Sequence, residues 1–288
     1  MDWQRHKHRW PNAAHSSFVR AARHEWHVQS MGDGPTTLLL HGAGASTHTW
    51  ADIFSTLGET GRVIAIDLPG QGFTRLGDRK RCGLDPMTED ISALLTALDV
   101  IPDLIIGHSA GAAIALNLAP TLTSQPHIIS INGAVENFSG VPGVLFPMVA
   151  KLLSLNPATA HFFSFFSANE ARVKRLIAST GSTLTPRQLS YYQALVSDVS
   201  HVNATLSMMA QWSLEDLPER LSKITSPVLF LTGARDGAVP PEASHRAAKL
   251  IAHATVETMP MLGHLMHEED ANAVIARIRA AQPVMEQT

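Results

Sequence analysis

A serine lies between two glycines at the end of an apolar run, in the stretch LIIGHSAGAAIALNLA (104–119). The residues before Ser109 are typical of a buried strand, and the small residues after it are typical of a helix. A G-x-S-x-G motif at such a turn exposes the serine hydroxyl as a nucleophile, and its glycines allow close backbone packing. The alternative is a serine that only caps the helix. We favour the nucleophile because other strand ends carry matching partners.

A serine hydroxyl attacks a carbonyl only when a base accepts its proton. In the expected chain order of serine, acid and histidine, Asp236 ends the stretch VLFLTGARD and His264 follows the next strand-like stretch in PMLGH. We therefore predict Ser109, Asp236 and His264 as a catalytic triad. The alternatives are a turn aspartate, a loop histidine, His267 as the base, and Glu136 as the acid.

The same chemistry needs hydrogen-bond donors for the negatively charged oxygen that forms on the carbonyl. One predicted donor is the backbone N–H of Ala110, directly after the nucleophile. The other is the N–H of Ala43 in the loop of LLLHGAGAS (38–46). A phosphate-binding loop is the alternative, but the G-x-G-x-x-G spacing and the P-loop lysine are absent.

Short apolar runs in both halves of the chain predict the strands that position these residues. They cover 36–42, 62–70, 103–109, 127–133, 226–236 and 255–264. Helical patterns lie between them, such as Ile91, Leu94, Leu95 and Leu98 at i, i+3, i+4 and i+7. This alternation predicts a mostly parallel sheet flanked by helices, in which the carboxyl ends of the strands form the site.

The alternation is interrupted between about 135 and 214, where no comparable strand occurs. Helical stretches rich in Phe and Met are expected instead, at 144–155, 160–179, 185–197 and 201–213. The prediction is an α/β core in two parts, 1–134 and 215–288, with an inserted all-helical cap at 135–214.

The composition of the cap predicts an apolar pocket above Ser109. The stretch FFSFF places phenylalanines on more than one face of a helix, so some of them are expected to face the pocket. The predicted lining residues are Phe146, Phe162, Phe166, Met208 and Trp212. Such a wall suits a bulky apolar ligand, with a tetrapyrrole or a long acyl group as candidates.

Composition also excludes several classes of function. Apolar residues make up 45% and charged residues 16% of 288 positions, which is enough for a large core and gives no sign of disorder. A net charge of −3 does not favour nucleic acid, the single cysteine suits a reducing compartment, and no metal-ligand spacing occurs. We predict a cytoplasmic protein without a transmembrane segment, metal or cofactor. Its basic N-terminal cluster at 5–9 is more typical of a solvated tail than of the alternative, a nucleic-acid or membrane anchor.

Together, the stretches HGAG, DLPGQGFT, GHSAG, GARD and GHLMHEE resemble the α/β-hydrolase superfamily. DWQRHKHRWPN, WHVQSMG, HGAGASTHTW, GSTL and SMMAQW resemble the magnesium-chelatase accessory proteins of bacteriochlorophyll biosynthesis, a photosynthetic pathway. The resemblance implies a hydrolase fold with a helical cap and a role near magnesium insertion into protoporphyrin IX, with chelatase subunits as candidate partners. The family's triad corresponds to Ser109, Asp236 and His264. Gln71 replaces the histidine of many hydrolases, which is expected to affect a turn rather than the triad.

Two hypotheses follow. The chain is a serine hydrolase, esterase-like and acting through an acyl-enzyme, or it is a non-catalytic protein that binds porphyrin or assists the chelatase. The complete set of catalytic residues favours the first, and the pathway implied by the resemblance favours the second.

Overall fold

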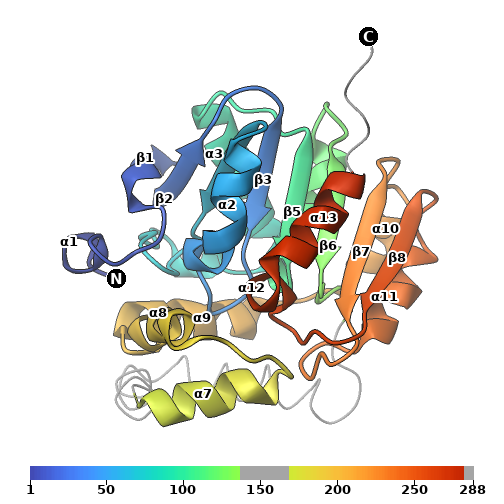
Figure 1. Ribbon diagram of the computed structural model, residues 1–288. Helices are drawn as coiled ribbons and strands as arrows, with labels where there is room; N and C mark the ends of the chain where they lie inside the picture. Colours follow the sequence, from blue (N-terminus) through green and yellow to red (C-terminus); the bar gives the residue numbers. More distant parts are fainter. Residues whose placement is uncertain (137–168, 282–288) are drawn as a thin grey trace.

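The computed structural model, which describes residues 1–136 and 169–281, is built around one eight-stranded sheet (Figure 1). The strand order is β1-β2-β4-β3-β5-β6-β7-β8, with β1 and β2 antiparallel to their neighbours and the other strands parallel. The strands are β1 Ser16–Ala21, β2 His24–Met31, β3 Thr36–Leu40, β4 Arg62–Ile66, β5 Leu104–His108, β6 His127–Ile131, β7 Val228–Gly233 and β8 Ala254–Met259. The six strands expected from the sequence are confirmed, and β1 and β2 are additional.

Helices cover both faces of the sheet, as expected for parallel strands. One face carries α2 (Ala51–Gly58), α12 (Met266–Glu269) and α13 (Ala271–Ala281). The other carries α3 (Leu84–Ala97), α4 (Ala110–Leu118), α10 (Leu217–Leu221) and α11 (Pro241–Ala248). Shorter helices are α1 (Trp3–His6), η1 (Ala13–His15), η2 (Thr47–Trp50), η3 (Arg79–Arg81) and η4 (Ala119–Thr121). Figure 1 shows α2 and α13 in front of the sheet.

The apolar run of β3 explains why both faces are covered. Successive side chains of a strand point to opposite faces. Leu38 and Leu40 pack into the core with α3 and α4, whereas Leu39 packs into the core with α2 and α13. All three leucines are fully buried.

Of the described helices between β6 and β7, three lie beside one another at one end of the sheet (Figure 1). They are α7 (Glu170–Ser179), α8 (Pro186–Val196) and α9 (Val199–Gln211). The helices expected at 185–197 and 201–213 correspond to α8 and α9. The one expected at 144–155, and the first part of the one at 160–179, lie outside the described residues. The boundaries 1–134, 135–214 and 215–288 stay predictions.

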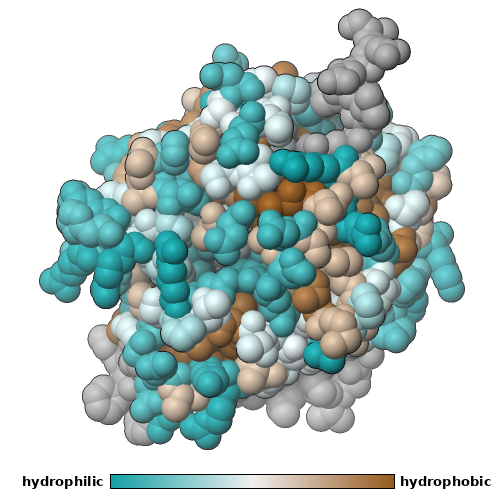
Figure 2. Space-filling view, viewed as in Figure 1, coloured by the Kyte–Doolittle hydropathy of each residue, from teal (hydrophilic) through white to brown (hydrophobic). Residues whose placement is uncertain are grey.

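The face of the molecule seen in Figure 2 is mostly hydrophilic. Figure 2 shows apolar residues in small patches separated by hydrophilic ones on this face. The most exposed large apolar side chains of the described chain come from different segments: Phe18, Ile101, Leu176, Leu250 and Met261. Of the helices in the described ranges, none is both long and apolar enough to span a bilayer.

Candidate active site

Ser109 lies at a tight turn between β5 and α4. Its backbone has φ 52° and ψ −115°, a conformation that residues other than glycine rarely adopt. The flanking glycines are needed for packing, because a Cβ on Gly111 would lie 2.2 Å from the Leu40 carbonyl oxygen and one on Gly107 would lie 2.3 Å from the Gly111 carbonyl oxygen. Although Ser109 occupies the N-cap position of α4, its side chain makes no capping hydrogen bond. The capping alternative therefore does not explain the serine.

Asp236 and His264 form the expected pair. The Nδ1 of His264 lies 2.8 Å from Oδ2 of Asp236. The other carboxylate oxygen of Asp236 accepts the N–H groups of Ala238 at 2.7 Å and Val239 at 2.8 Å. Because a carboxylate only accepts, Nδ1 carries the proton, and Nε2 of the neutral ring is left as a proton acceptor. Ser109 and His264 line the same cavity.

Two side chains hold the backbone of His264 in place. The His264 carbonyl accepts the Nε2–H of His108 at 2.9 Å and the Nδ2–H of Asn132 at 2.8 Å. The Oδ1 of Asn132 in turn accepts the N–H of Gly233 at 2.7 Å. Asn132 thus joins the ends of β6 and β7 to the histidine loop. Asn132 was not predicted from the sequence, although its place near the end of the predicted strand at 127–133 was a usable signal.

The alternative acid and base are engaged elsewhere. His267 is buried, its Nε2 lies 2.7 Å from Oγ1 of Thr49, and burial lowers its pKa to about 3. Glu136 forms an ion pair with Arg246 at 2.7 Å. Neither His267 nor Glu136 is among the described residues that line the cavity around Ser109.

The two predicted oxyanion donors flank the turn at Ser109. A Cβ on Gly42 would lie 3.0 Å from the Ser109 Cβ, so the loop that contains Ala43 packs directly against the nucleophile. Ala110 begins α4, and the first N–H groups of a helix have no acceptor within it. Among the described residues, neither the Ala43 N–H nor the Ala110 N–H has a protein acceptor. Both are therefore available to a ligand.

The cavity above Ser109 has a volume of about 510 Å³ and is mostly apolar. Its described walls include Val173, Leu176 and Ile177 of α7, Tyr192 and Val196 of α8, and Val202, Leu206 and Met209 of α9. No described lining residue is Asp, Glu, Lys or Arg. Among the lining residues of α8 and α9, the hydroxyls of Tyr192 and Thr205 are already paired, because Tyr192 donates to Glu268 and Thr205 donates to the His201 carbonyl.

None of the individual pocket residues predicted from composition is among the described residues of the cavity wall. Phe146, Phe162 and Phe166 lie outside the described residues. Met208 and Trp212 belong to the main core instead of the cavity wall, Met208 buried in it and Trp212 packed against it. Residues 202, 205, 206 and 209 of α9 face the cavity at i, i+3, i+4 and i+7. Position 208 lies off this face, and position 212 follows the last helical residue, so Met209 lines the cavity instead.

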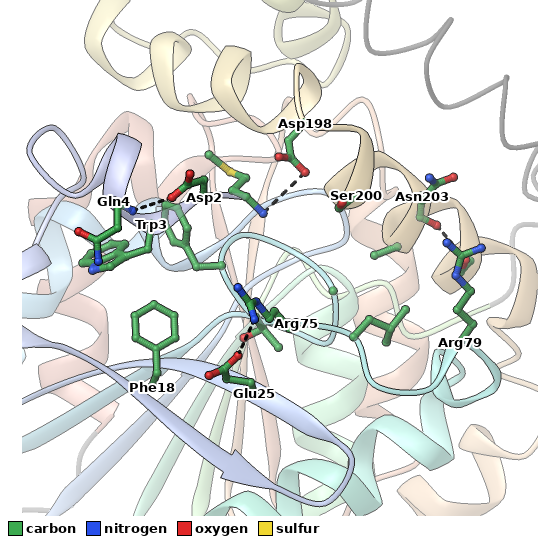
Figure 3. Close-up of a pocket in the computed structure, with 17 residues that line it drawn as sticks. Asp2, Trp3, Gln4, Phe18, Glu25, Arg75, Arg79, Asp198, Ser200 and Asn203 are labelled. Carbon is green, nitrogen blue, oxygen red and sulfur yellow. Dashed lines mark hydrogen bonds and ion pairs between the residues drawn. The ribbon is translucent and has the colours of Figure 1, made fainter.

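A second cavity, of about 860 Å³, lies on the opposite side of α9 (Figure 3). Figure 3 shows Asp198, Ser200 and Asn203 bordering it, opposite Arg75. It is more polar than the first cavity, and none of the predicted triad residues borders it. The helix α9 therefore separates an apolar space that contains Ser109 from a polar groove that does not.

Burial lowers the pKa of several histidines around the site. The pKa of His48 falls to about 3 and that of His201 to about 4, while that of His108 falls well below its usual value. These side chains are neutral at pH 7. Among the described residues, no cluster of His, Cys, Asp and Glu is arranged to bind a metal ion.

Comparison with known proteins identifies relatives over almost the whole chain. The model of the alpha/beta hydrolase family matches residues 37–278. The magnesium-chelatase 30 kDa subunit of Rhodobacter capsulatus is 41% identical, over 93% of this chain and 95% of its own. A pimeloyl-[acyl-carrier protein] methyl ester esterase of Xanthomonas oryzae is 27% identical, over 89% of this chain and all of its own. An esterase from Exiguobacterium antarcticum superposes with a TM-score of 0.75 at 19% identity, over 92% and 98% of the two chains, a likeness of fold alone.

Proposed function

This chain belongs to the alpha/beta hydrolase family, and we propose that it is a serine hydrolase that cleaves an apolar ester through an acyl-enzyme. The observation that carries the proposal is the strained Ser109 in the same cavity as a histidine held by a buried aspartate. Strain of this kind is usually retained for function.

In the proposed reaction, the Oγ of Ser109 attacks the ester carbonyl while the Nε2 of His264 takes the hydroxyl proton. The carboxylate of Asp236 stabilises the imidazolium. The N–H groups of Ala43 and Ala110 donate to the negatively charged oxygen of the tetrahedral intermediate. The intermediate collapses, the alcohol leaves with the proton from His264, and a water activated by the same ring hydrolyses the acyl-enzyme.

A fluorophosphonate probe tests the nucleophile. The unmodified chain should become labelled, and Ser109→Ala should not. Ser190→Ala, which removes an exposed hydroxyl on α8, is the matched control and should label like the unmodified chain. Absence of labelling in the unmodified chain, or equal labelling of Ser109→Ala, would overturn the assignment.

The relative from Rhodobacter capsulatus supports a second part of the proposal. This chain is 41% identical to that relative, which is named magnesium-chelatase 30 kDa subunit. We therefore infer that this chain is an accessory factor in bacteriochlorophyll biosynthesis at the magnesium-chelatase step, with chelatase subunits as partners. A non-catalytic role, in which the cavity binds a porphyrin or the chain assists the chelatase, is the competing function.

The two functions predict different pigment phenotypes. If catalysis is required, a strain that carries Ser109→Ala should accumulate the same pigment intermediates as a strain that lacks the whole gene. If binding alone is required, the Ser109→Ala strain should make normal pigment while the deletion strain does not. The level of the variant protein must be measured alongside, so that a loss of protein is not taken for a loss of chemistry.

A further inference from the structure

The peptide groups on both sides of Gly44, next to the predicted oxyanion donor Ala43, are held by buried side chains. The Gly44 N–H donates to the Oε1 of Gln71 at 2.7 Å. The Gly44 carbonyl accepts the Nε2–H of His201 at 3.2 Å. Gln71 is fully buried and His201 is 2% exposed. The side-chain partner of each bond is therefore buried, whereas Gly44 itself is half-buried at the edge of the cavity.

His201 connects three segments that are far apart in the sequence. Its Nε2–H donates to Gly44, in the loop after β3, and its Nδ1 accepts the N–H of Gly72, in the loop after β4, at 3.0 Å. These two bonds require one neutral tautomer with the proton on Nε2. Burial lowers the pKa of His201 to about 4, so this form is present at pH 7.

A second contact ties Gln71 to the same cap helix. The Nε2–H of Gln71 donates to the Sδ of Met208 at 3.1 Å. Met208 follows His201 by seven residues, or two turns of α9, so both lie on one side of the helix. Gln71 thus does more than shape a turn. Its side chain contacts both Met208 on α9 and Gly44 in the loop that contains Ala43, and so links the helix to that loop.

The loop itself is a closed turn, with the Ala45 N–H donating to the Gly42 carbonyl at 3.2 Å. Gly44 has φ +76°, which few other residues adopt without strain. Within this turn, the orientation of the Ala43 N–H follows from the backbone angles of residues 42 to 44. Release of Gly44 from Gln71 and His201 would let these angles vary.

We propose that Gln71 and His201 are positioning residues for the oxyanion hole: they fix Gly44 so that the Ala43 N–H points into the cavity, and they make this geometry depend on the docking of cap helix α9. The inference rests on the proposed hydrolase function. It assigns to a cap residue a role in the chemical step rather than only in the cavity wall.

Steady-state kinetics on a p-nitrophenyl ester separates positioning from binding. His201→Leu and Gln71→Met should lower kcat by about 10- to 100-fold with a small change in KM, since loss of one oxyanion donor costs about 10²–10³ in kcat and a misplaced donor costs less. His201→Gln keeps a donor and an acceptor near the same places and should recover most of the rate. Ser207→Ala, on the opposite side of α9 beside the polar groove, is the matched control and should be unaffected.

A measurement independent of turnover follows the Gly44 amide directly, by NMR on protein with ¹⁵N-labelled glycine. Exchange of this amide with solvent should be slow in the unmodified chain and at least about 10-fold faster in both variants, because Gln71→Met removes the acceptor of this N–H and His201→Leu removes the bond that holds the Gly44 carbonyl. The Gly107 amide, in β5, serves as the internal reference for global folding.

The two readouts distinguish failure of this inference from failure of the proposed function. If the unmodified chain neither hydrolyses esters nor labels with the probe, the hydrolase function fails, and unchanged Gly44 exchange in the variants would separately refute the positioning. A rise in KM without a fall in kcat would make His201 a wall residue and overturn the inference. If His201→Leu does not fold, His201→Gln and Gln71→Met provide the same comparison.

Discussion

The carboxyl group of Glu268 gives a quantitative test of the buried polar network beside the site. Its Oε1 accepts the hydroxyls of Tyr192 and Thr49, each at 2.5 Å. Thr49 in turn accepts the Nε2–H of His267 at 2.7 Å. Burial raises the pKa of Glu268 from 4.5 to about 7, against the opposing effect of the two hydroxyl donors. We predict that Glu268→Gln makes the protein more stable at alkaline pH.

The direction of this effect on stability follows from the numbers of protons that the folded and the unfolded chain bind. Between pH 4.5 and about 7 the folded protein holds a proton on Glu268 that the unfolded chain has released, so stability falls as pH rises through this window. A shift from 4.5 to about 7 corresponds to about 3 kcal/mol at 1.36 kcal/mol per pKa unit. A glutamine keeps the Oε1 acceptor and does not ionise, so the variant should escape this loss.

Thermal unfolding across a pH series measures the effect. At roughly 2.1 cal/mol/K per residue, the unfolding entropy of a 288-residue chain is about 0.6 kcal/mol/K, so about 3 kcal/mol corresponds to about 5 °C in Tm. The Tm of Glu268→Gln relative to the unmodified chain should rise by about this amount between pH 4.5 and 8.5. Glu242→Gln, which removes an exposed carboxylate on α11, is the control.

Other groups do not obscure the comparison. Burial lowers the pKa of His48 and His267 to about 3, so both destabilise the fold as pH falls below 6.5. This loss of stability at acid pH is the same in the unmodified chain and in Glu268→Gln, so it cancels in the difference between their Tm values. A Tm difference that is constant from pH 4.5 to 8.5 would show that Glu268 does not titrate in this window, and the reasoning would be wrong.

Three further predictions concern the site. Asp236→Asn should lower ester turnover by about 10⁴ with an unchanged circular dichroism spectrum, since an amide favours the wrong imidazole tautomer; unchanged turnover would assign the acid elsewhere. Gly111→Ala should lower the free energy of unfolding by on the order of 3 kcal/mol, because its Cβ would lie 2.2 Å from the Leu40 carbonyl oxygen; an unchanged midpoint in urea would contradict the tight packing. Neutral bulky acyl esters should give higher kcat/KM than acetate or than acyl chains of equal length that end in a carboxylate, because the described cavity wall carries no cation; fastest turnover of acetate would refute an apolar substrate.

The fold, and the placement of Ser109, Asp236 and His264 near one edge of the sheet, could be predicted because both depend on features that the sequence displays directly. Apolar runs mark the parallel strands, and the carboxyl ends of parallel strands meet at one edge. Residues at the carboxyl ends of such runs, as Asp236 and His264 are in the stretches 226–236 and 255–264, are therefore brought together without knowledge of side-chain packing. The elbow at Ser109 is similarly visible because only glycine permits its close contacts.

The hairpin of β1 and β2 could not be predicted from hydropathy, because its buried side chains are polar as well as apolar. His24 pairs with Asp90 at 3.0 Å, and His27 pairs with Asp67 at 2.8 Å. All four side chains are buried, although a hydropathy scale assigns histidine and aspartate to the polar residues expected at the surface. Burial that depends on a partner 40 or 66 residues away is not visible in a local pattern.

The details of the cavity wall depend on the rotation of each helix, which composition does not reveal. A turn of 100° per residue separates Met209, at the cavity, from Met208, in the core. Gln71 and His201 illustrate the same limit for polar residues. Each bonds to the loop at Gly44 from another part of the chain, and only the folded arrangement brings them together.

The distribution of strain and buried polarity bears on the choice between catalysis and binding. An apolar cavity that only held a ligand would gain nothing from a serine at positive φ or from an aspartate whose oxygens are fully engaged beneath a histidine. Both features oppose folding, by strain and by burial of polar groups. They are intelligible if Ser109 must attack and His264 must accept its proton. For the pathway role proposed above, this reasoning predicts that loss of the Ser109 hydroxyl alone reproduces the pigment phenotype of the deletion.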